Sequence, residues 1–171
     1  NYPGHIMFTL EDELEREMLW GDFLKAAIVA LSRKYELRRG IKGVIEGTLP
    51  VGGLSSSAAV ILTYLNAVCI ANDIQITRPE IISNAIWAER NYIGVNVGKL
   101  DQSCEVYCRK NGLLFLDTLD DSNEIIPVSS KMKPFEIMIV FGGKERQLAG
   151  SAYNTRVDEC KAACLLYTSP S

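Results

Sequence analysis

The sequence has almost no histidine, no excess of basic residues and no long hydrophobic run. His5 is the one histidine among 171 residues, so histidine supplies neither a paired catalytic group nor most of a zinc site. The net charge of −3 at pH 7 provides no basic surface for nucleic acid. No apolar stretch approaches the roughly 20 residues that span a bilayer. We therefore expect a protein that binds neither nucleic acid nor membrane, and the oligomeric state stays open.

The five cysteines are an odd number, which a closed disulfide framework does not explain. Free thiols are typical of a reducing compartment, so we expect a cytoplasmic protein. Cys104 and Cys108 are four residues apart and would share one helix face. A structural zinc site would need two further ligands, which the sequence does not offer nearby.

Both ends of the chain have the character of a fragment. The start, Asn1-Tyr2-Pro3-Gly4, has no initiator methionine, and residues 164–171 resemble the translated read-through of a sequencing adapter. The composition, 47% apolar and 23% charged, is that of one globular domain with a sizeable core. We expect this domain to occupy residues 1–163 and residues 164–171 to be a non-native tail.

Hydrophobic spacing predicts a mixture of helices and strands without regular βαβ alternation, which indicates an α+β sandwich. A strand end and a loop are expected over residues 1–19. The predicted helices cover residues 20–35, 56–71, 79–92 and 152–163, with a brief helix at 104–108 that Asp101 caps. Thr77 and Glu80 form a capping box at the third of these helices. The predicted strands cover residues 41–48, 113–116, 124–128 and 135–141, and the last is apolar enough to be central in its sheet.

One loop stands out because glycines and serines precede a helix. Gly52-Gly53-Leu54-Ser55-Ser56-Ser57 lies between the strand of residues 41–48 and the helix of residues 56–71. Adjacent glycines let backbone N–H groups turn toward an anion, and a helix N-terminus adds unpaired N–H groups and partial positive charge. The loop therefore predicts phosphate binding, with an ordinary turn and serine N-cap as the alternative. It is not a Walker A loop, because Gly-Lys-Ser/Thr is absent.

The wording of this loop, Pro-Val-Gly-Gly-Leu-Ser-Ser-Ser-Ala from Pro50, resembles the second signature motif of the GHMP kinases, the superfamily of galactokinase, homoserine kinase and mevalonate kinase. Three later segments, at residues 88–94, 98–102 and 152–160, resemble its galactokinase branch in the same order. The resemblance covers nearly all of residues 20–163. It implies a truncated ribosomal-protein-S5-like two-layer sandwich, which lacks its first strand, the N-terminal signature and the C-terminal glycine-rich motif.

The resemblance also implies a reaction and its residues. The reaction is ATP- and Mg²⁺-dependent phosphorylation of a hexose at the anomeric C1 hydroxyl. The residues carried over by position are Gly52, Gly53, Leu54, Ser55, Ser56 and Ser57 for the ATP phosphates, Ser57 and Glu89 for Mg²⁺, and Asp101 as the catalytic base. The sugar contacts are Gly98, Asp101 and Tyr153, and Trp20 and Phe23 are the residues near the adenine.

Each assignment has an ordinary structural alternative. A helical glutamate such as Glu89 is most often an exposed carboxylate, and Asp101 would also serve as a helix N-cap. Tyr153 would also be a packed aromatic at a helix start. Trp20 and Phe23 fall on the apolar stripe of their helix and fit a core role.

Several functions stay open on the sequence. Galactose and galacturonate are both candidate substrates, and Lys99 could suit a sugar carboxylate. The alternatives to a sugar kinase are a non-catalytic sugar- and ATP-binding regulator, another GHMP small-molecule kinase, and a structural domain without a ligand. The intact Ser55-Ser56-Ser57-Ala58 segment favours an enzyme. Because the missing signature supplies sugar-binding residues in this family, we do not expect this chain to be active alone.

Overall fold

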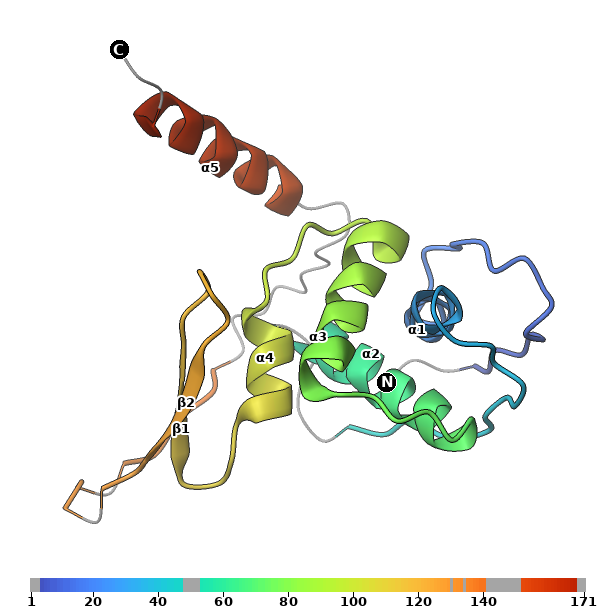
Figure 1. Ribbon diagram of the computed structural model, residues 1–171, viewed down its shortest axis with the longest axis horizontal. Helices are drawn as coiled ribbons and strands as arrows, with labels where there is room; N and C mark the ends of the chain where they lie inside the picture. Colours follow the sequence, from blue (N-terminus) through green and yellow to red (C-terminus); the bar gives the residue numbers. More distant parts are fainter. Residues whose placement is uncertain (1–3, 48–52, 130, 134, 141–151, 169–171) are drawn as a thin grey trace.

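A computed structural model describes residues 4–47, 53–129, 131–133, 135–140 and 152–168. Its main body is a group of helices with a two-stranded sheet at one side, and a further helix leads away from both (Figure 1). The helices of the main body are α1 (Asp22–Ser32), α2 (Ser56–Ala71), α3 (Arg78–Trp87), the π-helix η1 (Ala88–Ile93) and α4 (Leu100–Tyr107). A helical layer beside an antiparallel sheet is the α+β class that the sequence predicts.

The helix α2 forms the centre of the hydrophobic core. It packs against α1, α3 and α4, which explains why its sequence is apolar on most sides. Ile61, Leu65 and Val68 of α2 and Leu31 of α1 are almost completely buried. Burial of one such side chain contributes about 1.5–3 kcal/mol. The predictions for both helices are confirmed, although α1 begins two residues later than expected.

The capping box before α3 is confirmed on its threonine side. Thr77 is the N-cap, and its hydroxyl oxygen accepts a hydrogen bond from the Glu80 backbone N–H at 3.4 Å. The Glu80 carboxylate accepts hydrogen bonds from the Tyr35 hydroxyl at 2.8 Å and from Lys34 at 3.3 Å. These bonds connect α3 to the end of α1, and the Tyr35 hydroxyl is the main cause of a lowered Glu80 pKa.

A π-helix follows α3 without a break, a feature that the sequence did not predict. The chain continues as η1 from Ala88 to Ile93 and ends at Gly94, whose φ of 80° is the left-handed conformation expected after a helix. Single π-helical turns often mark functional sites, because the extra residue in the turn changes which side chains face inward. In η1 the inward-facing side chains include Glu89.

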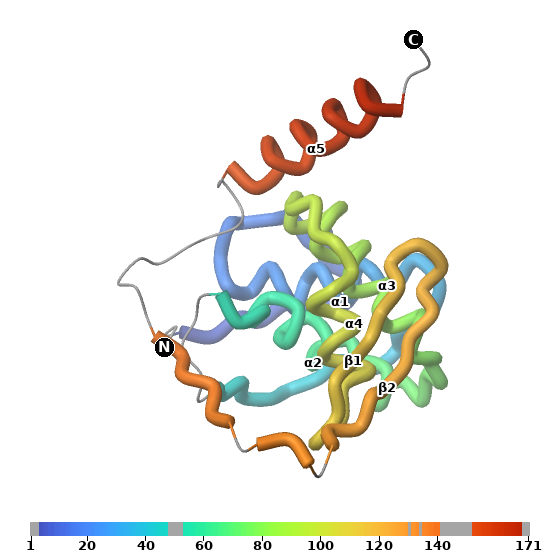
Figure 2. Tube along the Cα trace, turned by 90° about the vertical axis from the view of Figure 1, so that its left-hand side faces the viewer, coloured from blue at the N-terminus to red at the C-terminus, as the bar shows by residue number. Residues whose placement is uncertain are grey.

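The sheet consists of β1 (Gly112–Leu116) and β2 (Asn123–Pro127), which pair antiparallel with Leu114 opposite Ile125. This hairpin confirms the strands predicted over residues 113–116 and 124–128. Figure 2 shows it running alongside α4.

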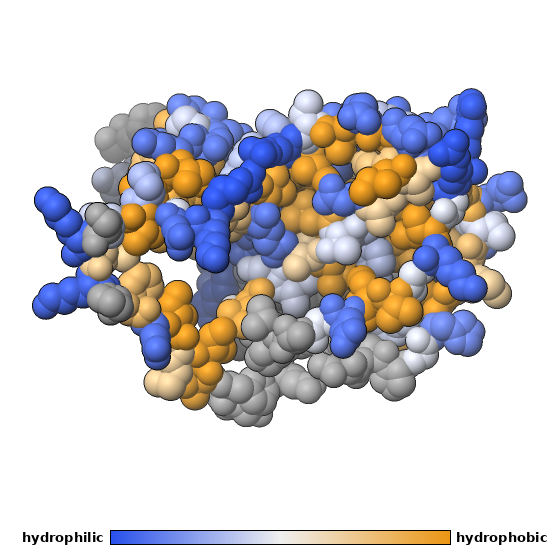
Figure 3. All heavy atoms as spheres, turned by 90° about the horizontal axis from the view of Figure 1, so that it is seen from below, coloured by the Kyte–Doolittle hydropathy of each residue, from blue (hydrophilic) through white to orange (hydrophobic). Residues whose placement is uncertain are grey.

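The other predicted strands are wrong as far as the structure describes them. Residues 4–19, 41–47 and 135–140 contain no strand; residues 1–3, 48 and 141 lie outside the described ranges. A strand needs a neighbour whose N–H and C=O groups pair with its own, and among the described residues only β1 and β2 pair. Val44 and Met138 are accordingly 95% and 84% exposed. Figure 3, which views the molecule from below, shows hydrophobic side chains at the surface.

The helix α5 (Tyr153–Thr168) leads away from the main body (Figures 1 and 2). Asn154 fastens its first turn: the side-chain amide donates to the Gly94 carbonyl at 2.8 Å, and its oxygen accepts from the Asn96 N–H at 2.8 Å. The helix predicted over residues 152–163 is confirmed and continues to Thr168. The proposed boundary between residues 163 and 164 stays a prediction.

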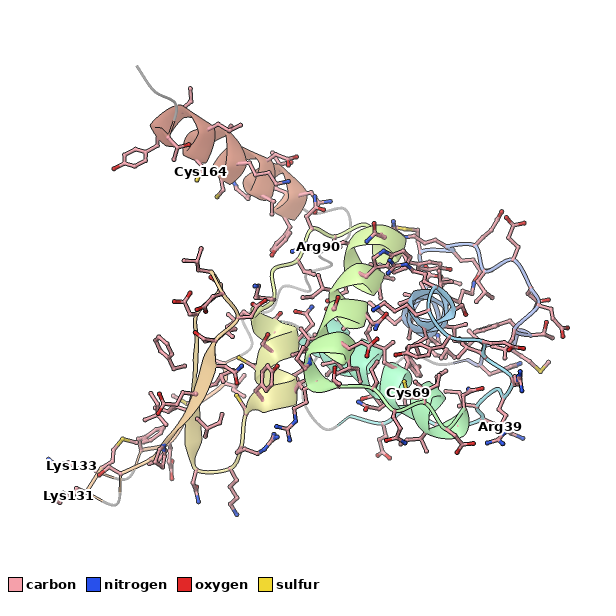
Figure 4. All side chains as sticks on the ribbon, in the orientation of Figure 1. Arg39, Cys69, Arg90, Lys131, Lys133 and Cys164 are labelled. Carbon is pink, nitrogen blue, oxygen red and sulfur yellow. The ribbon has the colours of Figure 1, made fainter. Side chains whose placement is uncertain are left out.

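All five cysteines are free, as expected, and Cys69 lies buried near the end of α2 (Figure 4). None of the helices in the described ranges combines the length and the apolar character that crossing a bilayer requires.

Candidate active site

The glycine–serine loop approaches α2 in a conformation that favours anion binding. Gly53 and Ser55 both have positive φ, 72° and 56°, and Leu54 between them does not. Alternation of this kind turns successive N–H groups toward one side, as in the concave backbone sites that bind phosphate. Gly52 lies outside the described residues, so its part in the loop stays a prediction.

The alternative interpretation of the serines as a side-chain N-cap is wrong. Ser55 occupies the N-cap position of α2, but its side chain makes no capping hydrogen bond. The first N–H groups of α2, which include those of Ser56 and Ser57, therefore have no serine hydroxyl in front of them. They remain available to an anion at the positive end of the helix.

Glu89 is a buried carboxylate, not the exposed helical residue of the ordinary interpretation. Its residue is 2% exposed, and its carboxylate accepts a hydrogen bond from the Gln102 side-chain amide. Burial raises the pKa of Glu89, the nearby Ser57 hydroxyl and the Gln102 amide oppose this shift, and the charge of Asp101 adds to it. Residues of three separate segments thus act on one buried carboxylate.

These residues fit a magnesium ion. The Ser57 hydroxyl and the Glu89 carboxylate would supply oxygen ligands, the type that Mg²⁺ prefers. The Oε1 atom of Gln102 is buried and has no hydrogen-bond partner. No group of three or more His, Cys, Asp and Glu side chains gathers for a metal in the described part of the chain. A Mg²⁺ site does not need one, because this ion usually takes one or two carboxylates and completes its shell with water and phosphate oxygens.

Asp101 lies in the first turn of α4, where its residue is exposed. The N-cap of this helix is Lys99, so the N-cap interpretation of Asp101 is wrong. The helix begins at Leu100, two residues too early for Asp101 to cap it. None of the described residues donates a hydrogen bond to the Asp101 carboxylate, which leaves it free to accept one from a bound hydroxyl.

The other predicted sugar-binding residues lie around the segment that enters α4. Gly98 is exposed, and no atom lies within 4 Å of the point where a Cβ would be. Tyr153 packs against the helical core at the start of α5. The packed-aromatic interpretation of Tyr153 is therefore confirmed, and its role in sugar binding stays a prediction.

Two residues near this segment have defined structural partners. Lys99 forms an ion pair with Asp121 and donates to the Thr118 carbonyl at 3.2 Å, both in the turn of the hairpin. Arg90 (Figure 4) donates from Nε and Nη2 to the Val97 carbonyl at 2.8 and 2.6 Å. These bonds fix the segment between η1 and α4.

Trp20 and Phe23 are both half-buried, and Phe23 packs against the hydrophobic core. The core role of Phe23 is thus confirmed. Their position beside the adenine stays a prediction.

Sequence reasoning missed two residues of the cluster, Gln102 and Glu105. Both belong to α4, and Glu105 lies four residues after Asp101, on the same helix face. Glu105 is exposed, but partial desolvation by neighbouring protein raises the pKa of its carboxyl to about 7, and the charges of Asp101 and Glu89 add to the shift. The four-residue spacing was the signal that could have identified Glu105; Gln102 carried none beyond its place after Asp101.

Replacement of Glu105 by Gln should remove a pH dependence of stability. In the folded protein this carboxyl titrates near 7 instead of at 4.5, so the folded state holds its proton more tightly than the unfolded state. The resulting stabilisation is complete below about pH 4.5, falls as the pH rises and is gone above about pH 7. Relative to Glu105→Gln, the parent should therefore lose stability across this window in urea unfolding.

The matched control for this comparison is Glu124→Gln, which changes an exposed glutamate on β2. A stability difference between parent and Glu105→Gln that stays constant between about pH 4.5 and 7 would contradict the raised pKa.

Comparison with known proteins places this geometry in a family. Residues 22–109 match the model of the GHMP kinases N-terminal domain. The chain is 34% identical over 161 residues to galacturonokinase from Arabidopsis thaliana, covering 92% of this chain and 38% of that protein. It is 35% identical over 158 residues to galactokinase from Thermococcus kodakarensis, covering 91% of this chain and 44% of that protein.

A solved structure agrees with these relatives. The fold matches Lactococcus lactis galactokinase complexed with galactose with a TM-score of 0.79 at 31% identity, over 90% of this chain and 39% of that chain. The chain thus spans less than half the length of each of these three proteins. Sequence, site geometry and fold agree: this chain belongs to the GHMP kinases, and it carries their N-terminal domain.

Proposed function

We propose that this chain is part of a sugar 1-kinase, which transfers the terminal phosphoryl group of ATP to the anomeric hydroxyl of galactose or galacturonate. One observation carries the proposal: the buried Glu89 carboxylate bonds to Gln102, the neighbour of Asp101 in the chain, and Ser57 and Asp101 both act on its pKa. Phosphoryl transfer needs phosphate positioning, a metal held by oxygen ligands and a residue that prepares the attacking hydroxyl. The cluster offers a candidate for each requirement.

The loop and the start of α2 would hold the phosphates. The N–H groups of Gly53 to Ser57 lie at the positive end of the helix, and no serine side chain caps them. Ser57 and Glu89 would hold Mg²⁺, which neutralises charge on the transferred phosphoryl group when it is bound. The Glu89 carboxylate would become a ligand in its ionised form, which the Gln102 hydrogen bond and the nearby Ser57 hydroxyl favour.

Asp101 would act as the general base. Its exposed carboxylate would accept the proton of the C1 hydroxyl while that oxygen forms its bond to the γ-phosphorus. The bond between the γ-phosphorus and the ADP oxygen breaks in the same step. Gly98 and Tyr153 would position the sugar, and Trp20 and Phe23 would lie on the adenine side.

Both sugars stay candidates, because relatives named galacturonokinase and galactokinase are about equally similar to the chain. Lys99 would bind the carboxylate of galacturonate only if its ion pair with Asp121 were broken. The five free cysteines support a cytoplasmic location.

The metal assignment predicts the behaviour of two variants of the complete gene product. Ser57→Ala and Glu89→Gln should each raise the Mg²⁺ concentration needed for half-maximal ATP turnover by about 100-fold or more. Removal of even a hydrogen-bond partner of a metal ligand costs roughly 10–100-fold. Both changes preserve most of the side-chain volume, so thermal stability should change little.

The matched control is Thr63→Ala, which also deletes a hydroxyl from α2. The Thr63 hydroxyl donates to the Ala59 carbonyl at 2.7 Å on the exposed side of the helix. Unchanged Mg²⁺ dependence in both site variants would remove Ser57 and Glu89 from the metal site.

The base assignment predicts a large effect of Asp101→Asn. Asn keeps the shape but cannot accept the proton, so formation of sugar 1-phosphate should fall by roughly 10²–10⁴. ATP affinity and thermal stability should stay near those of the parent, because Asp101 neither caps α4 nor lies in the core. The assay measures galactose and galacturonate in parallel.

Asp120→Asn, an exposed carboxylate in the hairpin turn, serves as the control. Turnover of either sugar by Asp101→Asn at the parental rate would overturn the base assignment. A parent that binds ATP and sugar without forming sugar 1-phosphate would favour the regulator instead.

A further inference from the structure

Gln102 is the most deeply buried polar residue of the cluster. It is 1% exposed and is among the largest fully buried side chains. Its Nε2 donates a hydrogen bond to Oε2 of Glu89. The opposite orientation of the amide would place its oxygen against a carboxylate oxygen, and two acceptors repel. The orientation of Gln102 is therefore set by the charge of Glu89.

The second polar atom of the amide has no partner. Oε1 of Gln102 is buried and accepts no hydrogen bond. An unsatisfied buried acceptor normally destabilises a protein, so an atom of this kind requires an explanation. Because Oε1 and Nε2 share one carbon, Oε1 lies close to the Glu89 carboxylate that Nε2 contacts.

We propose that Gln102 is a positioning residue of the metal site. Its Nε2–H holds the Glu89 carboxylate in the orientation that presents an oxygen toward the cation beside Ser57. Its Oε1 accepts a hydrogen bond from a water molecule bound to that cation. Mg²⁺ keeps several waters in protein sites, and groups that hydrogen-bond to metal ligands orient those ligands and tune the metal. The inference rests on the proposed function, namely on Glu89 as a metal ligand.

The position of Gln102 also connects the two parts of the site. It follows Asp101 directly in α4, and α4 packs against α2 and α3. The helix that carries the candidate base thus also orients the metal ligand on η1. A displacement of α4 would move the base and release Glu89 together.

A purely structural role for Gln102 makes a different prediction. In that case the bond to Glu89 would serve to attach α4 to η1, and its loss would lower stability without a specific effect on the metal. The unsatisfied Oε1 argues against this role, because an amide that served only to join two helices would be expected to satisfy both of its buried polar atoms.

The test measures metal binding directly on the complete gene product. The probe is Mn²⁺ in the presence of a non-hydrolysable ATP analogue, and bound Mn²⁺ is followed by electron paramagnetic resonance. Gln102→Met keeps the length of the side chain and removes both polar atoms. The expected result is a Mn²⁺ dissociation constant raised roughly 10–100-fold in a protein that still folds, with a lower thermal midpoint because the buried Glu89 carboxylate loses a donor.

The matched control removes another buried amide. Asn84 of α3 is 2% exposed and donates to the Glu80 carbonyl at 2.9 Å, away from the carboxylate cluster. Asn84→Leu should leave the Mn²⁺ dissociation constant unchanged. If Gln102→Met does not fold, Gln102→Asn is measured instead, since it withdraws the amide from Glu89 by one methylene and should also weaken Mn²⁺ binding.

The outcomes separate this inference from the proposed function. Parental Mn²⁺ affinity in the folded Gln102 variant, together with weakened affinity in Glu89→Gln, overturns the role of Gln102 and leaves Glu89 as a ligand. Parental affinity in Glu89→Gln overturns the metal assignment itself. A lowered thermal midpoint with parental Mn²⁺ affinity assigns Gln102 to structure alone.

Discussion

The burial of one carboxylate, that of Glu89, constrains the arrangement of the whole site. An ionised carboxylate that leaves water destabilises a protein unless it is hydrogen-bonded or paired with a cation. Here the Gln102 amide supplies a hydrogen bond and the Ser57 hydroxyl also lowers the pKa of Glu89, but burial still raises it. The start of α2, the π-helix η1 and α4 must therefore keep their positions relative to one another. A metal ion would supply the positive charge that the buried Glu89 carboxylate still lacks.

Several local features hold the segments around these three helices in place. The positive φ of Ser55 lets the loop enter α2 without a side-chain cap from this serine. The segment that leaves η1 is held by Arg90 through the Val97 carbonyl and by Asn154 through Gly94 and Asn96. This segment leads directly into α4. A sugar site between α4 and the start of α5 would thus be built on backbone that is fixed from both ends.

Structural features that depend on neighbouring residues in the chain could be predicted from the sequence. Features that depend on residues distant in the chain could not. The helix of residues 56–71 and the threonine cap of α3 follow from apolar spacing and capping chemistry, and both are confirmed. The strands at 41–47 and 135–140 are absent because strand formation requires a neighbour, which an apolar segment does not specify by itself. The capping role of Asp101 is wrong by two residues at a helix end, where local signals are least exact. A role for Gln102 could not be predicted, because it depends on the hydrogen bond to Glu89, which lies thirteen positions away in the chain.

The most direct test of this account is the position of the metal in a crystal of the complete gene product with Mn²⁺ and a non-hydrolysable ATP analogue. Anomalous scattering locates Mn²⁺ without reference to activity. The account predicts a peak within roughly 2.5 Å of both the Ser57 hydroxyl oxygen and one Glu89 carboxylate oxygen, a distance that fits direct coordination. A peak that contacts neither residue, with the nucleotide phosphates bound away from the start of α2, would contradict it.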